Sequence, residues 1–229
     1  MSRIISAPRV TRPIEYPTSD GRPMAETEYH FDDLFMVVQT IRHHFADEAN
    51  IAVLGNMLLF YEEGNKRKHV SPDVFVVFEV PKRRQKKKRL NYLVWEEGKA
   101  PQVVIELTSK STRREDMVTK RDIYRGILKV EEYFLFDPTE DYLKPSMQGF
   151  RRSRGAYKPI ELDAGRLLSR RLNAWLERHG DELRLRDAKT NELWPTPEEY
   201  QRQRAEQADQ RADSLAAEVE RLRQQLREK

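Results

Sequence analysis

The sequence predicts an α/β domain followed by a charged C-terminal helix. Several short runs rich in valine, isoleucine and phenylalanine, among them residues 72–80 and 102–107, are typical of buried strands. A stretch with helical periodicity separates such runs, and an alternation of strands and helices is typical of α/β folds. At 229 residues the chain is long enough for one medium-sized domain with extensions.

The composition favours a compact core with charged extensions. Hydrophobic residues make up 38% of the chain, below the usual globular level, and charged residues 35%, above it. No stretch approaches the roughly 20 apolar residues that span a bilayer, and the N-terminus lacks the apolar segment of a secretory signal. The absence of cysteine excludes disulfide bonds and thiolate metal sites. We therefore expect a cytoplasmic protein.

The first elements follow from proline content and apolar spacing. Residues 1–24 hold four prolines and no periodic pattern, which predicts an extended arm. A helix is expected from about Ala25, because Leu34, Val38 and Ile41 lie on one apolar stripe. Residues 51–61 then have the composition of a strand that is interrupted by a glycine.

Three buried strands are expected in the centre of the chain, at residues 72–80, 102–107 and 132–138. Between the last two, Thr112 and Glu115 form the pattern of a capping box, so a helix should begin at about Arg113 and end near Leu128. Further on, the segment "RRSRGA" between two aromatic residues predicts a hairpin.

The C-terminal part is expected to be helical. A short amphipathic helix that ends at Gly180 is predicted from Leu168, Leu172, Trp175 and Leu176. Residues 25–194 are expected to form the globular domain, and residues 195–229 the C-terminal helix.

The C-terminal helix carries a heptad pattern. Apolar residues recur at spacings of three and four, at Ala205, Ala208, Ala212, Leu215, Val219, Leu222 and Leu226. In a parallel dimer, Arg204 would face Asp209 and Glu218 would face Arg223, and both pairs are attractive. Three of the seven apolar residues are alanine, so a solitary charged helix is the alternative to a coiled coil.

A basic run, "KRRQKKKR", has seven cations in eight positions: Lys82, Arg83, Arg84, Lys86, Lys87, Lys88 and Arg89. Such a run does not belong in a core. It suits the backbone of a nucleic acid, because neutralised phosphates release their counterions. A solvated loop without a partner is the alternative.

The helix expected after residue 112 places a lysine on its apolar side. At 100° per residue, Lys120 falls within the arc formed by Met117, Ile123, Tyr124, Ile127 and Leu128. A lysine in that position either extends outward to solvent or meets an anion.

Two carboxylates could supply that anion. Glu106 ends one buried strand and Asp73 begins another, so the two acids converge if the strands are neighbours. Hard oxygen ligands of this kind suit Mg²⁺, which commonly takes one or two carboxylates with substrate phosphate oxygens. The alternatives are a structural network of Asp73, Lys120 and Glu106, or three separate exposed charges.

Several segments, in order, resemble the Uma2 family of the PD-(D/E)XK nuclease superfamily. They are "MAETEYH", "GNMLLFYEEG", "SPDVFVV", "VVIELTSKST", "DMVTKRDIY" and "EEYFLFDP", and they cover about residues 25–176. The resemblance implies a restriction-endonuclease-like fold, a mixed sheet flanked by helices. It also implies a metal-dependent endonuclease that hydrolyses DNA phosphodiester bonds.

The resemblance assigns roles to particular residues. Asp73 and Glu106 match the acidic positions of the superfamily, and they would bind Mg²⁺ or Mn²⁺ with the backbone carbonyl of Leu107. The superfamily lysine, expected two residues after Glu106, is absent, and Lys120 on the next helix matches the lysine of the Uma2 pattern. Glu28 matches a family acid that could add to the metal site.

Three functions remain open at this stage. The first is a DNA endonuclease whose catalytic residues are Asp73, Glu106 and Lys120, and which forms a homodimer through the C-terminal helix. The second is a nucleic-acid-binding module on the same fold that lacks catalytic activity. The third is a coiled-coil adaptor for which the globular part is only a scaffold.

Overall fold

A six-stranded mixed sheet forms the centre of the protein, in a computed structural model that describes residues 14–19, 21, 28–81 and 88–227. The strand order is β1 (Ile51–Gly55), β4 (Val74–Phe78), β6 (Val103–Leu107), β7 (Glu132–Phe136), β8 (Met147–Ser153) and β9 (Ala156–Ile160). The β6–β7 pair is parallel and the other neighbours in this sheet are antiparallel. The prediction of a mixed α/β sheet is confirmed.

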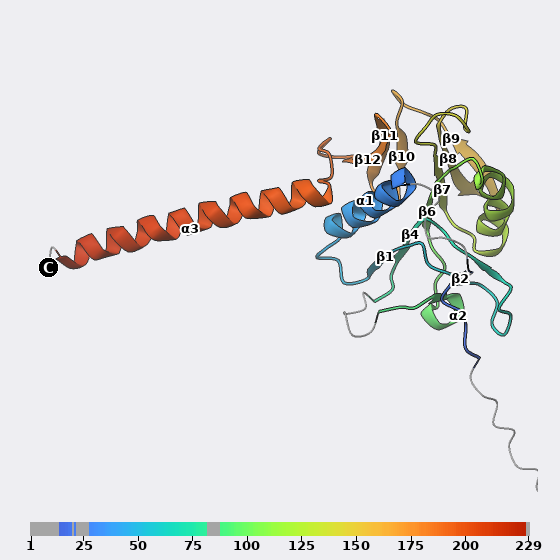
Figure 1. Cartoon of the computed structure of the whole chain (residues 1–229), viewed down its shortest axis with the longest axis horizontal. Coiled ribbons are helices and arrows are strands. Elements are labelled where there is room, and N and C mark those ends of the chain that lie inside the picture. The colour runs from blue at the N-terminus through green and yellow to red at the C-terminus, as the bar shows by residue number, and fades with distance from the viewer. Residues whose placement is uncertain (1–13, 20, 22–27, 82–87, 228–229) are drawn as a thin grey trace, which may run out of the picture.

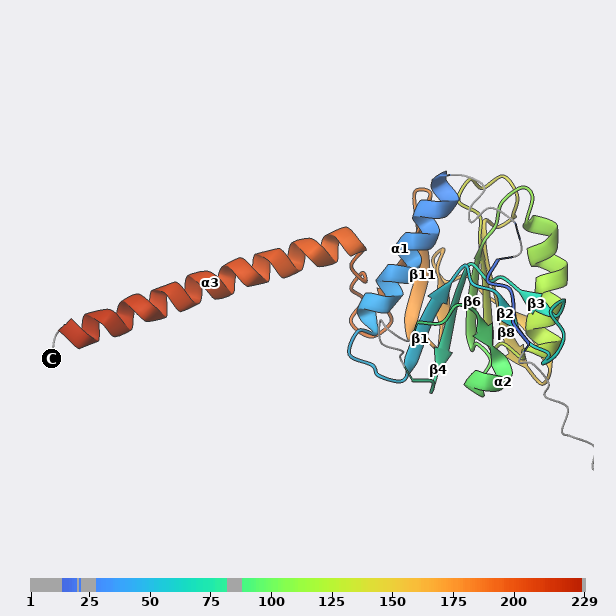
Figure 2. The same ribbon diagram turned by 60° about the horizontal axis from the view of Figure 1, so that its bottom comes forward.

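Each face of the sheet is covered by its own layer (Figures 1 and 2). Alternate residues of β6 point to opposite faces, as the period of two requires. Val103, Ile105 and Leu107 pack in a core with α1 (Glu28–His44) and with side chains of residues 167–185. Val104 packs in the other core, with side chains of the helix formed by residues 113–127.

The helix of residues 113–127 begins and ends close to the predicted positions. Much of it has π-helical hydrogen bonding, in the segments η2 (Glu115–Lys120) and η3 (Ile123–Ile127). A hydroxyl cluster precedes it, in which the Ser109 N–H donates to Thr112 Oγ1 at 3.0 Å. Wide π-helical turns are rare and occur often at functional sites, so this helix is a candidate location for functional residues.

The predicted helix at residues 168–180 is wrong. This segment forms a second sheet of β10 (Leu167–Ser169), β11 (Ala174–His179) and β12 (Glu182–Asp187). Asn173 has a φ of 54° and Gly180 a φ of 65°, so the first interrupts any helix and the second makes the turn between β11 and β12. Leu172 and Leu176 pack in the α1 core. Leu168 of β10 lies opposite Trp175 of β11, on the other face of this sheet, so these four residues do not share one helix face.

A third, small sheet lies at the end of the body and contains β2 (Leu59–Phe60), β3 (His69–Val70) and β5 (Tyr92–Leu93). The short helix α2 (Val94–Glu97) follows β5 directly.

The predicted interruption at Gly55 is confirmed, because β1 ends there and the chain resumes as β2. The predicted hairpin is also confirmed, with Ser153 opposite Ala156 between β8 and β9.

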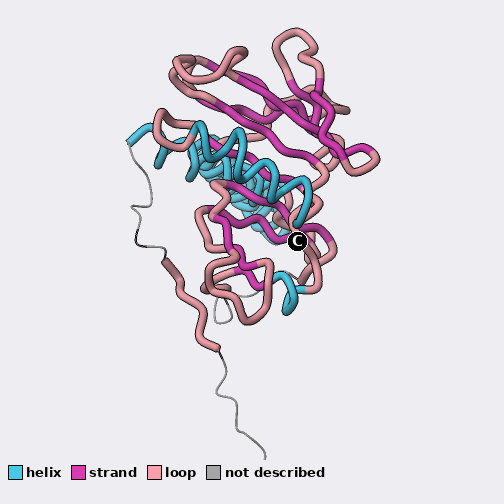
Figure 3. The backbone as a smooth tube through the Cα atoms, turned by 90° about the vertical axis from the view of Figure 1, so that its right-hand side faces the viewer, coloured by secondary structure: helices cyan, strands magenta, loops and turns pink. Residues whose placement is uncertain are grey.

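The C-terminal helix α3 (Pro197–Arg227) extends away from the body (Figure 1). Because Figure 3 looks along its length, α3 is foreshortened there behind the strands of the body. Contacts at its first turn include a stack of Tyr200 on His43 at 4.2 Å and an ion pair of Glu199 with Arg184 at 2.9 Å. Among the described residues, no helix is long and apolar enough to cross a membrane.

Candidate active site

The antiparallel pairing of β4 with β6 brings Asp73 and Glu106 together. Val74 lies opposite Ile105, so the residues next to them, Asp73 and Glu106, meet at the end of this pair. The Leu107 N–H donates to Asp73 Oδ2 at 2.8 Å, and the Asp73 N–H donates to Glu106 Oε2 at 3.2 Å. Glu106 is fully buried and Asp73 is half-buried, so the pair has one enclosed and one accessible side.

A glycine holds the backbone of Asp73 close to α1. A Cβ atom at Gly55 would lie 2.9 Å from the Asp73 carbonyl oxygen and 2.6 Å from a methyl group of Val38. Neither distance is possible for a real side chain, so a glycine is required where β1, β4 and α1 meet.

Lys120 contacts two carboxylates. Its Nζ lies 2.9 Å from Glu106 Oε2 and 3.0 Å from Asp116 Oδ1, and all three side chains are buried. Lys120 and Asp116 are one turn apart on η2, whereas Glu106 comes from β6. We call Asp73, Glu106 and Lys120 the Asp–Glu–Lys cluster. The three residues that the sequence singled out are therefore linked by direct contacts.

Two tyrosines and an aspartate complete the surroundings of the cluster, and none of the three was assigned a role in the site from the sequence. The Tyr124 hydroxyl donates to Glu106 Oε1 at 2.6 Å, and the Tyr133 hydroxyl donates to the backbone carbonyl of Asp116 at 2.9 Å. Asp116 and Tyr124 are each four residues from Lys120, and that spacing on one helix face was the available signal. Tyr133, on β7, gives no such signal.

Burial sets the protonation of these groups. Burial raises the pKa of Glu106 well above its usual value, and the charges of Asp73 and Asp116 raise it further against the opposing effect of Lys120. Burial likewise raises the pKa of Asp116. Burial alone would lower the pKa of Lys120, but the summed charges of its carboxylate neighbours outweigh this effect and raise it. Lys120 is therefore charged at neutral pH.

The donor atoms suit a hard divalent cation. In the part of the chain that the structure describes, no three histidine or acidic side chains gather tightly enough to hold an ion by themselves. Mg²⁺ commonly needs only one or two carboxylates, because waters and substrate oxygens complete its shell. The N–H of Leu107 points to Asp73, and in a strand the C=O of the same residue faces the same neighbour. Two carboxylates and this carbonyl thus fit the cation.

The structure does not describe the side chains of several predicted site residues. The side chain of Glu28 lies outside the described residues. The same holds for most of the basic run, namely Lys82, Arg83, Arg84, Lys86 and Lys87. For these six side chains the predicted roles remain predictions.

The flanks of the basic run lie at the other end of β4 from Asp73. Pro81 follows β4, and the Arg89 guanidinium donates to its carbonyl oxygen at 3.3 Å. Five residues of strand separate that end from Asp73 by about 17 Å. Lys88 is exposed, but Arg89 forms a buried ion pair with Glu97 at 2.6 Å. Arg89 therefore fixes the return of the loop to the body.

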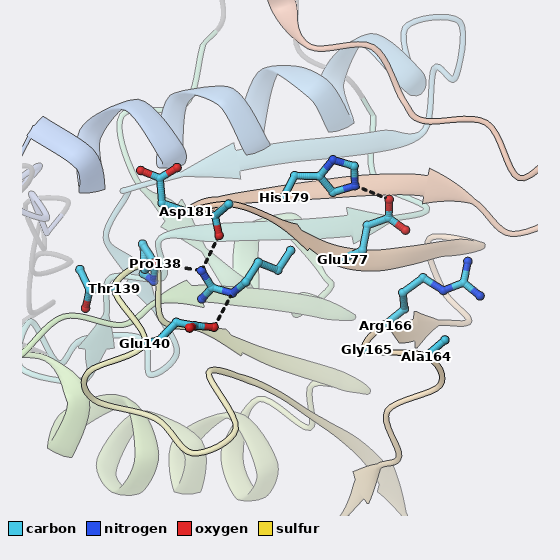
Figure 4. Close-up of a pocket in the computed structure, with 11 residues that line it drawn as sticks. Pro138, Thr139, Glu140, Ala164, Gly165, Arg166, Glu177, His179 and Asp181 are labelled. Carbon is cyan, nitrogen blue, oxygen red and sulfur yellow. Dashed lines mark hydrogen bonds and ion pairs between the residues drawn. The ribbon is translucent and has the colours of Figure 1, made fainter.

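An open pocket of about 750 Å³ lies elsewhere, between the turn after β7 and the β11–β12 turn (Figure 4). Four of its charged groups pair with one another. His179 contacts Glu177 at 2.6 Å, and Arg178 contacts Glu140 at 3.2 Å. No residue of the Asp–Glu–Lys cluster lines it, so we do not place the chemistry there.

Replacement of Glu106 by glutamine tests the raised pKa of this carboxyl. When the pKa of Glu106 is higher in the folded state than in the unfolded state, its carboxyl contributes to the free energy of unfolding in the protonated form. This contribution is complete below the unfolded pKa, about 4.3, and is lost as pH rises through the folded pKa. Glutamine does not titrate. In EDTA, the free energy of unfolding of Glu106→Gln relative to wild type should therefore increase from pH 5 to pH 8. Urea denaturation across this range measures the difference, and a constant or falling difference would contradict the raised pKa.

Comparisons with known proteins bear on the identity of the chain. A search of curated proteins gave no match. A solved structure from Anabaena variabilis, titled "a putative nuclease belonging to DUF820", is 16% identical, with a TM-score of 0.46, and the match covers 69% of this chain and 78% of that one. The model of the Uma2 family, described as "Putative restriction endonuclease", matches residues 10–177. Because this match spans well over half of the chain, the protein belongs to the Uma2 family.

Proposed function

We propose that the protein is a metal-dependent endonuclease that hydrolyses DNA phosphodiester bonds at the Asp–Glu–Lys cluster. The observation that carries the proposal is the buried contact of Lys120 with Glu106, beside Asp73 on the adjacent strand. The description of the family as a restriction endonuclease family supports the same reaction class. An acid pair that can hold a divalent cation, next to a fixed ammonium, is suited to stabilising charge on a phosphate.

Asp73, Glu106 and the Leu107 carbonyl would hold Mg²⁺ or Mn²⁺. The cation would supply Lewis-acid stabilisation of the phosphate oxygens and make a water molecule more acidic. The buried carboxylates of Glu106 and Asp116 outnumber the single ammonium of Lys120, and Asp73 adds a further acid at the accessible side. A cation at this side would offset that excess of negative charge.

Lys120 would act on the reacting groups directly. Its ammonium is held between Glu106 and Asp116, so its donor hydrogens are fixed in direction before substrate arrives. In this role it would orient the attacking water or offset charge that develops on the phosphate. Tyr124 donates to the second oxygen of Glu106 and so fixes the plane of that carboxylate.

The loop after β6 offers cations close to the cluster. Lys110, Arg113 and Arg114 are exposed and follow Leu107 within a few residues, at the N-terminal end of the helix of residues 113–127. None of these three cations forms an ion pair with another residue in the described ranges. They would contact the DNA backbone beside the scissile bond, and the run of residues 82–89 would contact it farther along the duplex.

Removing one of these loop cations should lower the affinity for DNA and should make that affinity less dependent on salt concentration. For Arg113→Ala and Arg114→Ala, the slope of log K against log salt should fall by about one per lost phosphate contact. Lys158→Ala on β9, an exposed cation of another element, is the matched control and should leave the slope unchanged. Fluorescence anisotropy with a labelled duplex in EDTA measures binding without cleavage. Slopes equal to wild type would place the DNA elsewhere.

The proposal is tested by incubating supercoiled plasmid with the full chain and Mg²⁺ or Mn²⁺. Nicked and linear products are expected, and EDTA should abolish them. Asp73→Ala and Lys120→Ala should each lack activity, whereas both should still shift labelled DNA in a gel.

The second candidate is a binding module without catalysis. It is favoured by one observation, the threonine at position 108 where the superfamily lysine is expected. Retained gel shift with no cleavage under either divalent cation would support this candidate and overturn the nuclease.

A further inference from the structure

The outer part of α3 presents an apolar stripe without a partner in the described chain. The helix has 31 residues and no buried side chain, and its length is about 46 Å. Leu215, Val219, Leu222 and Leu226 are 67%, 47%, 47% and 75% exposed. Helices in proteins gain most of their stability from packing of an apolar face, so a helix of this kind is expected to have a partner.

The stripe has the spacing of a coiled-coil seam. With Val219 at position a and Leu222 at position d, the a positions are Ala205, Ala212, Val219 and Leu226, and the d positions are Ala208, Leu215 and Leu222. A valine at a with leucines at d favours two-stranded parallel coiled coils. The remaining positions are mostly charged or polar, as expected for the solvated sides of such a helix.

We infer that the partner is the α3 helix of a second copy of this chain, parallel and in register. The charges that flank the seam favour this arrangement. Each g position faces the e position five residues later in the other copy, which pairs Arg204 with Asp209 and Glu218 with Arg223. The third such pair, Arg211 with Ala216, is neutral, so no repulsive pair occurs.

An antiparallel arrangement loses these contacts. It would bring neither Arg204 to Asp209 nor Glu218 to Arg223, because the helix ends exchange places. Within one chain, Arg221 pairs with Glu218 at 2.7 Å, but both side chains are well exposed, so Glu218 is accessible to a second helix. A parallel pair also places both bodies at the same end. If the proposed nuclease function is correct, two active sites would then face one duplex.

The mass of the full chain in solution tests the association. Light scattering after size exclusion should give twice the chain mass of 27.2 kDa. Leu222→Glu places a charge in the seam and should weaken the dimer at least tenfold. Gln224→Glu adds the same charge on the outer face, two residues away, and should leave the dimer intact. A monomeric wild-type protein, or equal effects of both substitutions, would overturn the inference.

The orientation can be tested by cross-linking, since the chain contains no cysteine. In a parallel pair, identical d positions face each other within disulfide reach. Leu222→Cys should therefore give a covalent dimer on mild oxidation, and Gln224→Cys should not. A dimer in which Leu222→Cys fails to cross-link would overturn the parallel register. Neither measurement uses DNA, so the result is independent of the nuclease proposal.

Discussion

Replacement of Asp73 by asparagine is expected to lower the rate of DNA cleavage by at least about 10²-fold while the protein remains folded. The asparagine oxygen can still accept the hydrogen bond from the Leu107 N–H, which is 2.8 Å long in the wild type. The change removes the negative charge that a divalent cation requires. Lewis-acid stabilisation contributes several kcal/mol to such reactions, and about 3 kcal/mol corresponds to 10²-fold in rate.

Initial rates of plasmid nicking in Mg²⁺ measure the effect of Asp73→Asn, and circular dichroism checks the fold. Asp122→Asn is the matched control, because this exposed aspartate lies in the helix of residues 113–127 and pairs with Arg125 at the surface. The control should cleave at the wild-type rate. Cleavage by Asp73→Asn within threefold of wild type would rule out a catalytic role for Asp73.

Replacement of Lys120 by methionine is expected to destabilise the protein and to abolish cleavage. Methionine keeps most of the length of the side chain but leaves Glu106 and Asp116 buried without their cation. Breaking a buried ion pair by removing one partner costs about 3–5 kcal/mol. Protonation of the carboxyls, whose pKa values burial already raises, should bring the loss toward the lower end of that range.

Urea denaturation and plasmid nicking together separate the two effects of Lys120→Met. The double variant Glu106→Gln/Lys120→Met removes one of the carboxylates left behind, so it should be less destabilised than Lys120→Met alone. Both variants should lack activity, because Lys120 would act on the reacting groups in addition to stabilising the fold. A folded Lys120→Met protein that cleaves at the wild-type rate would show that this lysine has only a structural role.

The central strands could be predicted from the sequence because they are buried on both faces. Residues 103–105 and 133–136 contain no charged side chain, and such runs are typical of central strands. The secondary structure of the segment after residue 166 was harder to predict from the sequence. There, each strand is half-buried and short, so spacings of three and four between leucines of different strands imitate a helix.

The site could be predicted in part. Glu106 and Lys120 stand out in the sequence because each is a charge at an apolar position, and the structure joins them at 2.9 Å. Tyr124 and Tyr133 do not stand out, because an aromatic residue on an apolar face is ordinary core material. Their hydrogen bonds to Glu106 and Asp116 depend on how the helix of residues 113–127 packs on the sheet. That packing is a tertiary property.

The position of the residues that flank the basic run also depends on topology. In the sequence, the basic run begins nine residues after Asp73. In the fold, β4 intervenes and carries the chain to the other end of the sheet. The loop cations Lys110, Arg113 and Arg114 are farther from Asp73 in the sequence but follow β6 at the end where the cluster lies.

The most direct test of the account is an anomalous difference map from crystals of the full chain soaked in Mn²⁺. The central claim is that Asp73 and Glu106 share one divalent cation beside Lys120. A peak is expected at about 2 Å from an oxygen of each carboxylate, and no such peak is expected in crystals of Asp73→Asn. A map without a peak between these carboxylates, with the Lys120 ammonium still on Glu106, would contradict it.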